Sequence, residues 1–121
     1  ADLKSAETHG LFAVLYKDLP LDEEYYTLAR TYEMKKDWKN AMKYVNRSLE
    51  EKPENKNAEY TKAIIADNYY EDRRAVLKLY EDFIKKYEKG EYAKYDPVLR
   101  LAQERRDKLN EEIFMAEGEE E

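Results

Sequence analysis

Residues 22–55, DEEYYTLARTYEMKKDWKNAMKYVNRSLEEKPEN, contain two amphipathic segments separated by a short polar turn. Apolar residues recur at three- and four-residue steps in both segments, which places them on one face of an α-helix. Asp22 is predicted to cap a first helix at residues 23–36. Asp37 is predicted to cap a second helix at residues 38–52. Because the connection is so short, the two helices are expected to be antiparallel neighbours.

The same 34 residues carry the spacing of the tetratricopeptide repeat (TPR), W-x2-L-G-x2-Y followed by A-x3-F and P. The matching residues are Tyr25, Leu28, Ala29, Tyr32, Ala41, Val45 and Pro53. Small Ala29 and Ala41 let two helices approach closely, and Pro53 ends the second helix. The segment therefore resembles a TPR. The resemblance implies an all-α fold in which antiparallel helix hairpins stack as a short right-handed solenoid.

The sequence on either side of this repeat predicts about six helices in one TPR-like domain, residues 1–116. Residues 2–17 are predicted as an N-terminal helix or the second half of a partial repeat. Residues 56–89 resemble a degenerate second repeat, with helices at about 58–70 and 73–87. Tyr60, Ala63 and Ile64 are expected to face inward in the first of these helices.

The C-terminal part of the chain is predicted to cap the solenoid, because an end repeat otherwise exposes its apolar face. Asp96-Pro97 is a helix-start signal, and the capping helix is expected at residues 97–116. Its inward stripe is predicted as Val98, Leu101, Ala102, Leu109 and Ile113. The like-charged tail, residues 117–121, is predicted to be disordered.

Composition disfavours several functional classes. The chain has 28 acidic and 22 basic residues, a net charge of −6, which disfavours nucleic acid as a partner. It has no cysteine, and its single histidine, His9, has no second nitrogen ligand nearby in the sequence, so neither a metal nor a cofactor is expected. No phosphate loop or nucleophile motif occurs, which favours a protein that is not an enzyme. No apolar run approaches the ~20 residues of a membrane span, and no signal-peptide pattern is recognised.

The TPR resemblance implies that the first helix of each hairpin lines a concave groove, which binds a peptide or helix of a partner protein. Carried onto this sequence, the groove combines cations for a carboxylate with adaptable apolar contacts. Its predicted residues are Glu23, Tyr26, Thr27, Arg30, Glu33 and Met34 from residues 22–55, and Glu59, Thr61, Lys62 and Ile65 from the second repeat.

Two alternatives stay open at the level of sequence. Ile113, Phe114 and Met115 form an apolar cluster near the end of the chain, which could dock a partner or join copies into a homo-oligomer. The chain could also be an accessory domain of a larger protein, such as one of the bacterial envelope. Cytoplasmic and periplasmic locations both fit the sequence.

Overall fold

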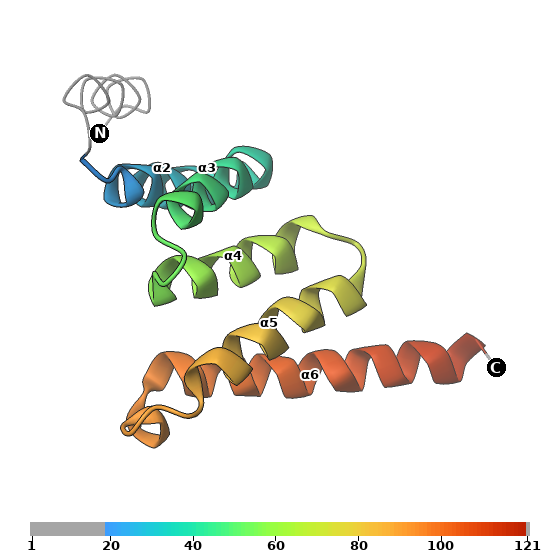
Figure 1. The fold of residues 1–121 in the computed structure, drawn as a ribbon. Coiled ribbons are helices and arrows are strands. Elements are labelled where there is room, and N and C mark those ends of the chain that lie inside the picture. Colours follow the sequence, from blue (N-terminus) through green and yellow to red (C-terminus); the bar gives the residue numbers. More distant parts are fainter. Residues whose placement is uncertain (1–18, 121) are drawn as a thin grey trace. The chain divides into compact units, whose positions relative to one another are not determined.

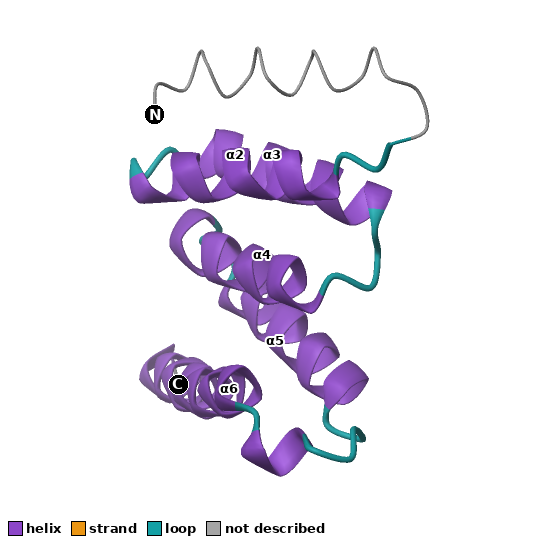
Figure 2. Ribbon diagram, turned by 90° about the vertical axis from the view of Figure 1, so that its left-hand side faces the viewer, coloured by secondary structure: helices purple, strands orange, loops and turns teal. Residues whose placement is uncertain are grey.

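The computed structural model describes residues 19–120, and this part of the chain is all-helical and contains no strand (Figures 1 and 2). The expected all-α class is therefore confirmed. The predicted helix at residues 2–17 lies outside the described residues, so five α-helices stand where about six helices were expected. These elements are α2 (Asp22–Met34), α3 (Trp38–Glu51), α4 (Lys56–Tyr69), α5 (Arg73–Tyr87), the 3-10 helix η1 (Ala93–Tyr95) and α6 (Pro97–Glu120).

The chain divides into two compact units. The first unit ends at Tyr69 and contains α2, α3 and α4. The second begins at Tyr70 and contains α5, η1 and α6. The boundary falls inside the predicted second repeat, residues 56–89, so its two helices belong to different units.

Capping side chains begin most of the helices, because a carboxylate or amide oxygen satisfies the free N–H groups of the first turn, and the predicted caps Asp37 and Asp96 are among them. The acceptor–donor pairs are Asp37 with Asn40 N at 3.2 Å, Asn55 with Ala58 N at 3.1 Å, Asp72 with Arg74 N at 3.0 Å and Asp96 with Val98 N at 2.9 Å. The prediction for α2 is wrong. Its cap is Leu21, which has no capping side-chain bond, and Asp22 lies inside the helix.

Asp22 joins the start of α2 to the end of α3 instead. Its backbone carbonyl accepts a 2.8 Å hydrogen bond from the buried Ser48 hydroxyl. Its carboxylate lies 3.9 Å from the Lys52 ammonium. Ser48 of α3 therefore holds the backbone of Asp22, and α2 already begins at this residue instead of after it.

The α2–α3 hairpin is packed as its small residues predict. Ala29 and Ala41 are both completely buried, which confirms that the two helices approach closely at these positions. Three tyrosine rings fill the space beside them. The Tyr32 and Tyr44 rings are nearly parallel, with centroids 5.5 Å apart, and the Tyr25 ring lies 6.2 Å from that of Tyr44. The hairpin interior is therefore aromatic as well as aliphatic.

The buried face of α4 differs from the predicted one. Tyr60 and Ile64 are only half-buried, although the sequence favoured them as inward residues. The buried residues are Ala58, Thr61, Ala63, Ile65 and Ala66. Thr61 is 2% exposed and Ile65 is 0% exposed, so their assignment to an open groove is wrong. The reason is that apolar or small residues occur on more than one side of this helix, and periodicity alone does not select the buried side.

The second unit is built on the packing of α5 against α6. Its core residues are Val76, Leu77, Tyr80, Phe83 and Ile84 from α5, and Leu99, Ala102 and Leu109 from α6. Leu101 was expected to face inward but is 51% exposed, because the buried stripe of α6 passes through Leu99 instead.

The prediction for the acidic end of the chain is also corrected. Residues 117–120 were expected to be disordered, but α6 includes them. Glu117 forms an ion pair with Arg74 of α5, which ties this turn to the rest of the second unit. No proline follows Pro97, and a single glycine, Gly118, is tolerated in a helix at a cost of about 1 kcal/mol.

The turn between α2 and α3 contains a strained residue. Lys36 has a φ of 60°, in the left-handed region, where it allows the Asp37 N–H to donate to the Tyr32 carbonyl at 2.9 Å. Because glycine adopts this conformation without steric cost, we expect Lys36→Gly to raise the free energy of unfolding by about 0.5–1 kcal/mol. Urea denaturation followed by circular dichroism measures the change. Lys35→Gly is the matched control, since Lys35 has a φ of −88° and glycine there should destabilise the chain.

Candidate functional site

The exposed side of α2 carries four of the predicted groove residues in one line. Glu23, Thr27, Arg30 and Met34 follow one another at three- and four-residue steps, which places them on one face of the helix. All four are exposed, and Met34 is 80% exposed. We call these four residues the α2 surface.

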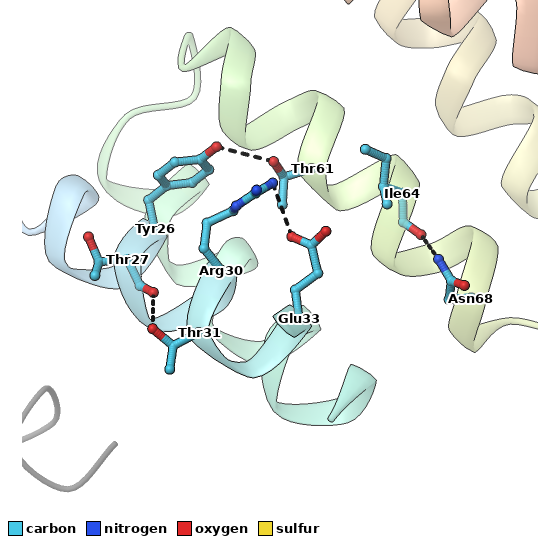
Figure 3. A network of polar contacts seen from close by, with 8 residues as sticks. All are labelled: Tyr26, Thr27, Arg30, Thr31, Glu33, Thr61, Ile64 and Asn68. Carbon is cyan, nitrogen blue, oxygen red and sulfur yellow. Dashed lines mark hydrogen bonds and ion pairs between the residues drawn. The ribbon is translucent and has the colours of Figure 1, made fainter. Parts of the chain in front are cut away.

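A second line of side chains on α2 points toward α4 within the first unit (Figure 3). The Tyr26 hydroxyl lies 3.3 Å from the Thr61 hydroxyl of α4, within hydrogen-bonding distance. Thr61 is buried by this arrangement and Tyr26 is half-buried. Part of the predicted groove is therefore filled by contact between α2 and α4, and the α2 surface lies beside that contact.

Arg30 connects the two lines. Its guanidinium lies 3.2 Å from the Glu33 carboxylate, one turn along the helix (Figure 3). Burial raises the pKa of Glu33 above its ordinary value of 4.5, because the ionised carboxylate loses solvation, while the charge of Arg30 acts in the opposite direction. Arg30 itself is exposed, and its guanidinium has five N–H donors, so it can bind Glu33 and a ligand carboxylate together.

Replacing Glu33 with glutamine tests whether burial or the charge of Arg30 has the larger effect on the pKa of Glu33. A raised pKa means that the folded chain holds the proton more tightly than the unfolded chain does. The contribution of Glu33 to stability therefore falls as the pH rises through the interval from 4.5 to the higher folded pKa. We expect Glu33→Gln to raise Tm at neutral pH and to leave Tm nearly unchanged at pH values below that interval. Thermal denaturation across this pH range, with Glu50→Gln on α3 as the equal change of charge at an exposed residue, measures the effect. A lower Tm at neutral pH would mean that the Arg30 attraction outweighs burial.

The threonines of α2 determine which polar groups this helix presents to a partner. The Thr27 hydroxyl donates to the Glu23 carbonyl at 2.9 Å, and the Thr31 hydroxyl donates to the Thr27 carbonyl at 2.8 Å. Because these protons are already bound, each hydroxyl presents its oxygen and the neighbouring methyl group outward. The α2 surface thus combines the Glu23 carboxylate, the Arg30 cation, the Met34 thioether and the Thr27 hydroxyl oxygen.

The predicted contribution of α4 is smaller than expected. Glu59 and Lys62 are half-buried, whereas Thr61 and Ile65 are buried. Lys62 is the cation that the sequence placed with Arg30 in the groove.

The C-terminal apolar cluster lies in the second unit, apart from the α2 surface in sequence. Phe114 is 73% exposed, Met115 is 63% exposed and Ile113 is half-buried. An open hollow of about 460 Å³ adjoins two of them. It is lined by Arg74, Asn110, Glu111, Ile113, Phe114 and Glu117. The sequence indicated the apolar residues but missed the hollow, since its lining depends on Arg74 of α5 lying beside α6.

Within residues 19–120, no group of three His, Cys, Asp or Glu side chains is placed to hold a metal ion. None of the helices described for the chain combines the length and apolarity that a membrane span needs. No family model matches the chain, and comparison with curated proteins and with solved structures finds no match either.

Proposed function

We propose that the chain is a non-catalytic protein-interaction module, in which residues 22–69 form one and a half TPR-like repeats with right-handed stacking. In this proposal α2 and α3 are the two helices of one repeat, and α4 is the first helix of the next. The α2 surface binds a peptide or helix of a partner protein.

The observation that carries the proposal is the contact between Tyr26 and Thr61. These residues are 35 positions apart, about one repeat length, and they join α2 to α4. First helices of consecutive repeats are neighbours in a TPR solenoid, where they line the concave side. The packing of α3 against both α2 and α4 gives further support, because the second helix of a repeat contacts the first helices before and after it.

The α2 surface has the length and chemistry of a peptide site. Glu23 and Met34 are 11 positions apart, which is about 16 Å along a helix. About five residues of extended peptide cover that distance. Arg30 would bind a peptide carboxylate, and Met34 would contact an apolar side chain beside it. The partner segment is therefore expected to combine an acidic residue with an apolar residue.

Selection of short peptides from a random library on the intact chain, followed by fluorescence anisotropy with the selected peptide, tests the proposal. We expect Arg30→Glu to weaken binding about tenfold, because it replaces attraction with repulsion, and Met34→Ser to weaken it by a smaller factor. Both residues are exposed, so Tm should change little. Tyr26→Ala is a poorer test, since it also removes the contact with Thr61.

Lys39→Glu is the control, since it makes the same change of charge at an exposed residue of α3. Equal weakening by Lys39→Glu and Arg30→Glu would show that only net charge matters. If neither α2 variant changes the affinity, the α2 surface is not the binding site.

A further inference from the structure

The last turns of α6 carry apolar side chains that α5 leaves uncovered. Leu109 is completely buried, but Ile113, one turn later, is only half-buried. Phe114 and Met115 follow with most of their surface in water. A neighbouring pair of exposed large apolar residues is typical of a contact surface rather than of a solvated helix end.

The positions of these residues around α6 explain why they are uncovered. α5 has 15 residues and α6 has 24, so α6 is longer by about 13 Å at 1.5 Å per residue. Arg74 in the first turn of α5 pairs with Glu117 near the end of α6, so the two helices are antiparallel and α5 begins there. Phe114 and Met115 are turned about 100° and 200° around α6 from Ile113, so they lie off the stripe that packs on α5 and stay exposed.

The hollow beside these residues is lined by both apolar and charged side chains. Ile113 and Phe114 supply its apolar atoms, while Arg74, Glu111 and Glu117 supply charge. An occupant must therefore offer a large apolar side chain to the apolar lining residues and polar or charged groups to the charged ones.

The charges of the lining residues and of the last turns of α6 indicate which groups these are. Residues 111–121 contain six glutamates and no lysine or arginine. Arg74 pairs with Glu117, and Arg105 pairs with Glu112 at 3.1 Å. Glu111 and Glu119 have no ion-pair partner among the described residues. The potential around the hollow is thus negative, and a cationic occupant is the complementary one.

We propose that this hollow is a second binding surface, which takes a basic amphipathic helix from a partner protein. A leucine or a similar side chain of the partner packs on Ile113 and Phe114. Lysine or arginine residues one turn away on the same helix meet Glu111 in the lining of the hollow. A second copy of this chain fits less well, because pairing two copies here brings two sets of glutamates together. The proposal does not depend on the α2 surface, which favours a segment with a carboxylate.

Fluorescence anisotropy with a labelled amphipathic peptide of about 14 residues tests the proposal, with leucines on one face and lysines on the other. We expect a Kd on the order of 10 µM in about 50 mM salt, and much weaker binding in about 300 mM salt. Phe114→Ala should weaken binding about tenfold and Glu111→Gln about threefold. Phe114 is exposed, so its removal should leave the circular dichroism spectrum unchanged.

Three controls keep the outcomes distinct. A peptide with glutamate in place of every lysine should not bind. Two variants should bind the basic peptide with the affinity of the unaltered chain. One is Leu101→Ala, which removes an exposed leucine outside the lining of the hollow, and the other is Arg30→Glu on α2. Equal binding of the acidic peptide, or an unchanged affinity for Phe114→Ala, would overturn the proposal. Sedimentation that shows a dimer dissociated by Phe114→Ala would also overturn it, in favour of a second copy as the occupant.

Discussion

Tyr44→Ala is expected to lower the free energy of unfolding by about 3–5 kcal/mol, the range for removal of a buried aromatic side chain. The Tyr44 ring stacks between those of Tyr25 and Tyr32 and is almost completely buried. The Arg47 guanidinium also lies 5.5 Å from its centroid. The substitution leaves a cavity and removes both ring contacts, each worth about 0.5–1.5 kcal/mol beyond the area they bury.

Tyr44→Phe is the matched control, since it keeps the ring and removes only the hydroxyl. Urea denaturation followed by circular dichroism at 222 nm compares the two variants. If the stacked rings stabilise the α2–α3 hairpin, the phenylalanine variant should lose much less free energy of unfolding than the alanine variant. Similar losses for both would place the stabilising interaction at the hydroxyl and not in the stacked rings.

Leu109→Ala is expected to lower the stability of the second unit by about 2–5 kcal/mol. Leu109 is completely buried on the face of α6 that packs against α5. Alanine there loses the apolar contacts of the side chain and leaves a cavity between the two helices. Amide hydrogen exchange resolved by residue measures the loss of protection within α5 and α6.

Leu101→Ala is the matched control, since it removes a leucine from the same helix at an exposed position. Because Leu101 is half exposed, its removal should cost less than about 1 kcal/mol. The sequence expected both leucines to face inward, so this pair also tests the corrected orientation of α6. Equal losses of protection for the two variants would contradict that orientation.

Helix boundaries could be predicted from the sequence because the signals that set them are local. Asp72 and Asp96 bond to the N–H groups two and three residues later, and the predicted starts of α5 and α6 are correct. Lys52 before Pro53 is extended, with a ψ of 94°, as the proline ring requires, and α3 ends there. Asp22 is the exception, since a residue on another helix, Ser48, holds its backbone carbonyl.

Helix orientation was harder to predict, because it depends on neighbours distant in the sequence. In α4 the adjacent residues Ile64 and Ile65 both satisfy an apolar pattern, and only the packed structure shows Ile65 to be the buried one. In α6 the buried stripe runs through Leu99 and Leu109 and includes the half-buried Arg106, a charged residue that interrupts the apolar pattern. Periodicity does not resolve such cases.

The candidate site was therefore predicted in part. Glu23, Thr27, Arg30 and Met34, which the TPR resemblance placed in the groove, are exposed, whereas Tyr26 and Glu33 from the same helix are half-buried. The residues of α4 were assigned from repeat spacing alone, and two of them, Thr61 and Ile65, are buried. The hollow beside Phe114 could not be predicted, since it exists only where α5 begins beside α6.

The two proposed surfaces favour partners of opposite charge. Arg30 on the α2 surface suits an acidic segment, whereas Glu111 beside Phe114 suits a basic one. Binding at each surface can therefore be measured with its own peptide, and a variant of one surface serves as the control for the other.

The central claim is that a partner segment lies along the exposed side of α2, with α4 beside it. Nuclear magnetic resonance titration of the uniformly ¹⁵N-labelled chain with the library-selected peptide tests it directly. Amide shifts should concentrate at Glu23, Thr27, Arg30 and Met34, with smaller shifts around Lys62. Shifts confined to the exposed side of α3, or to α5 and α6, would contradict the claim.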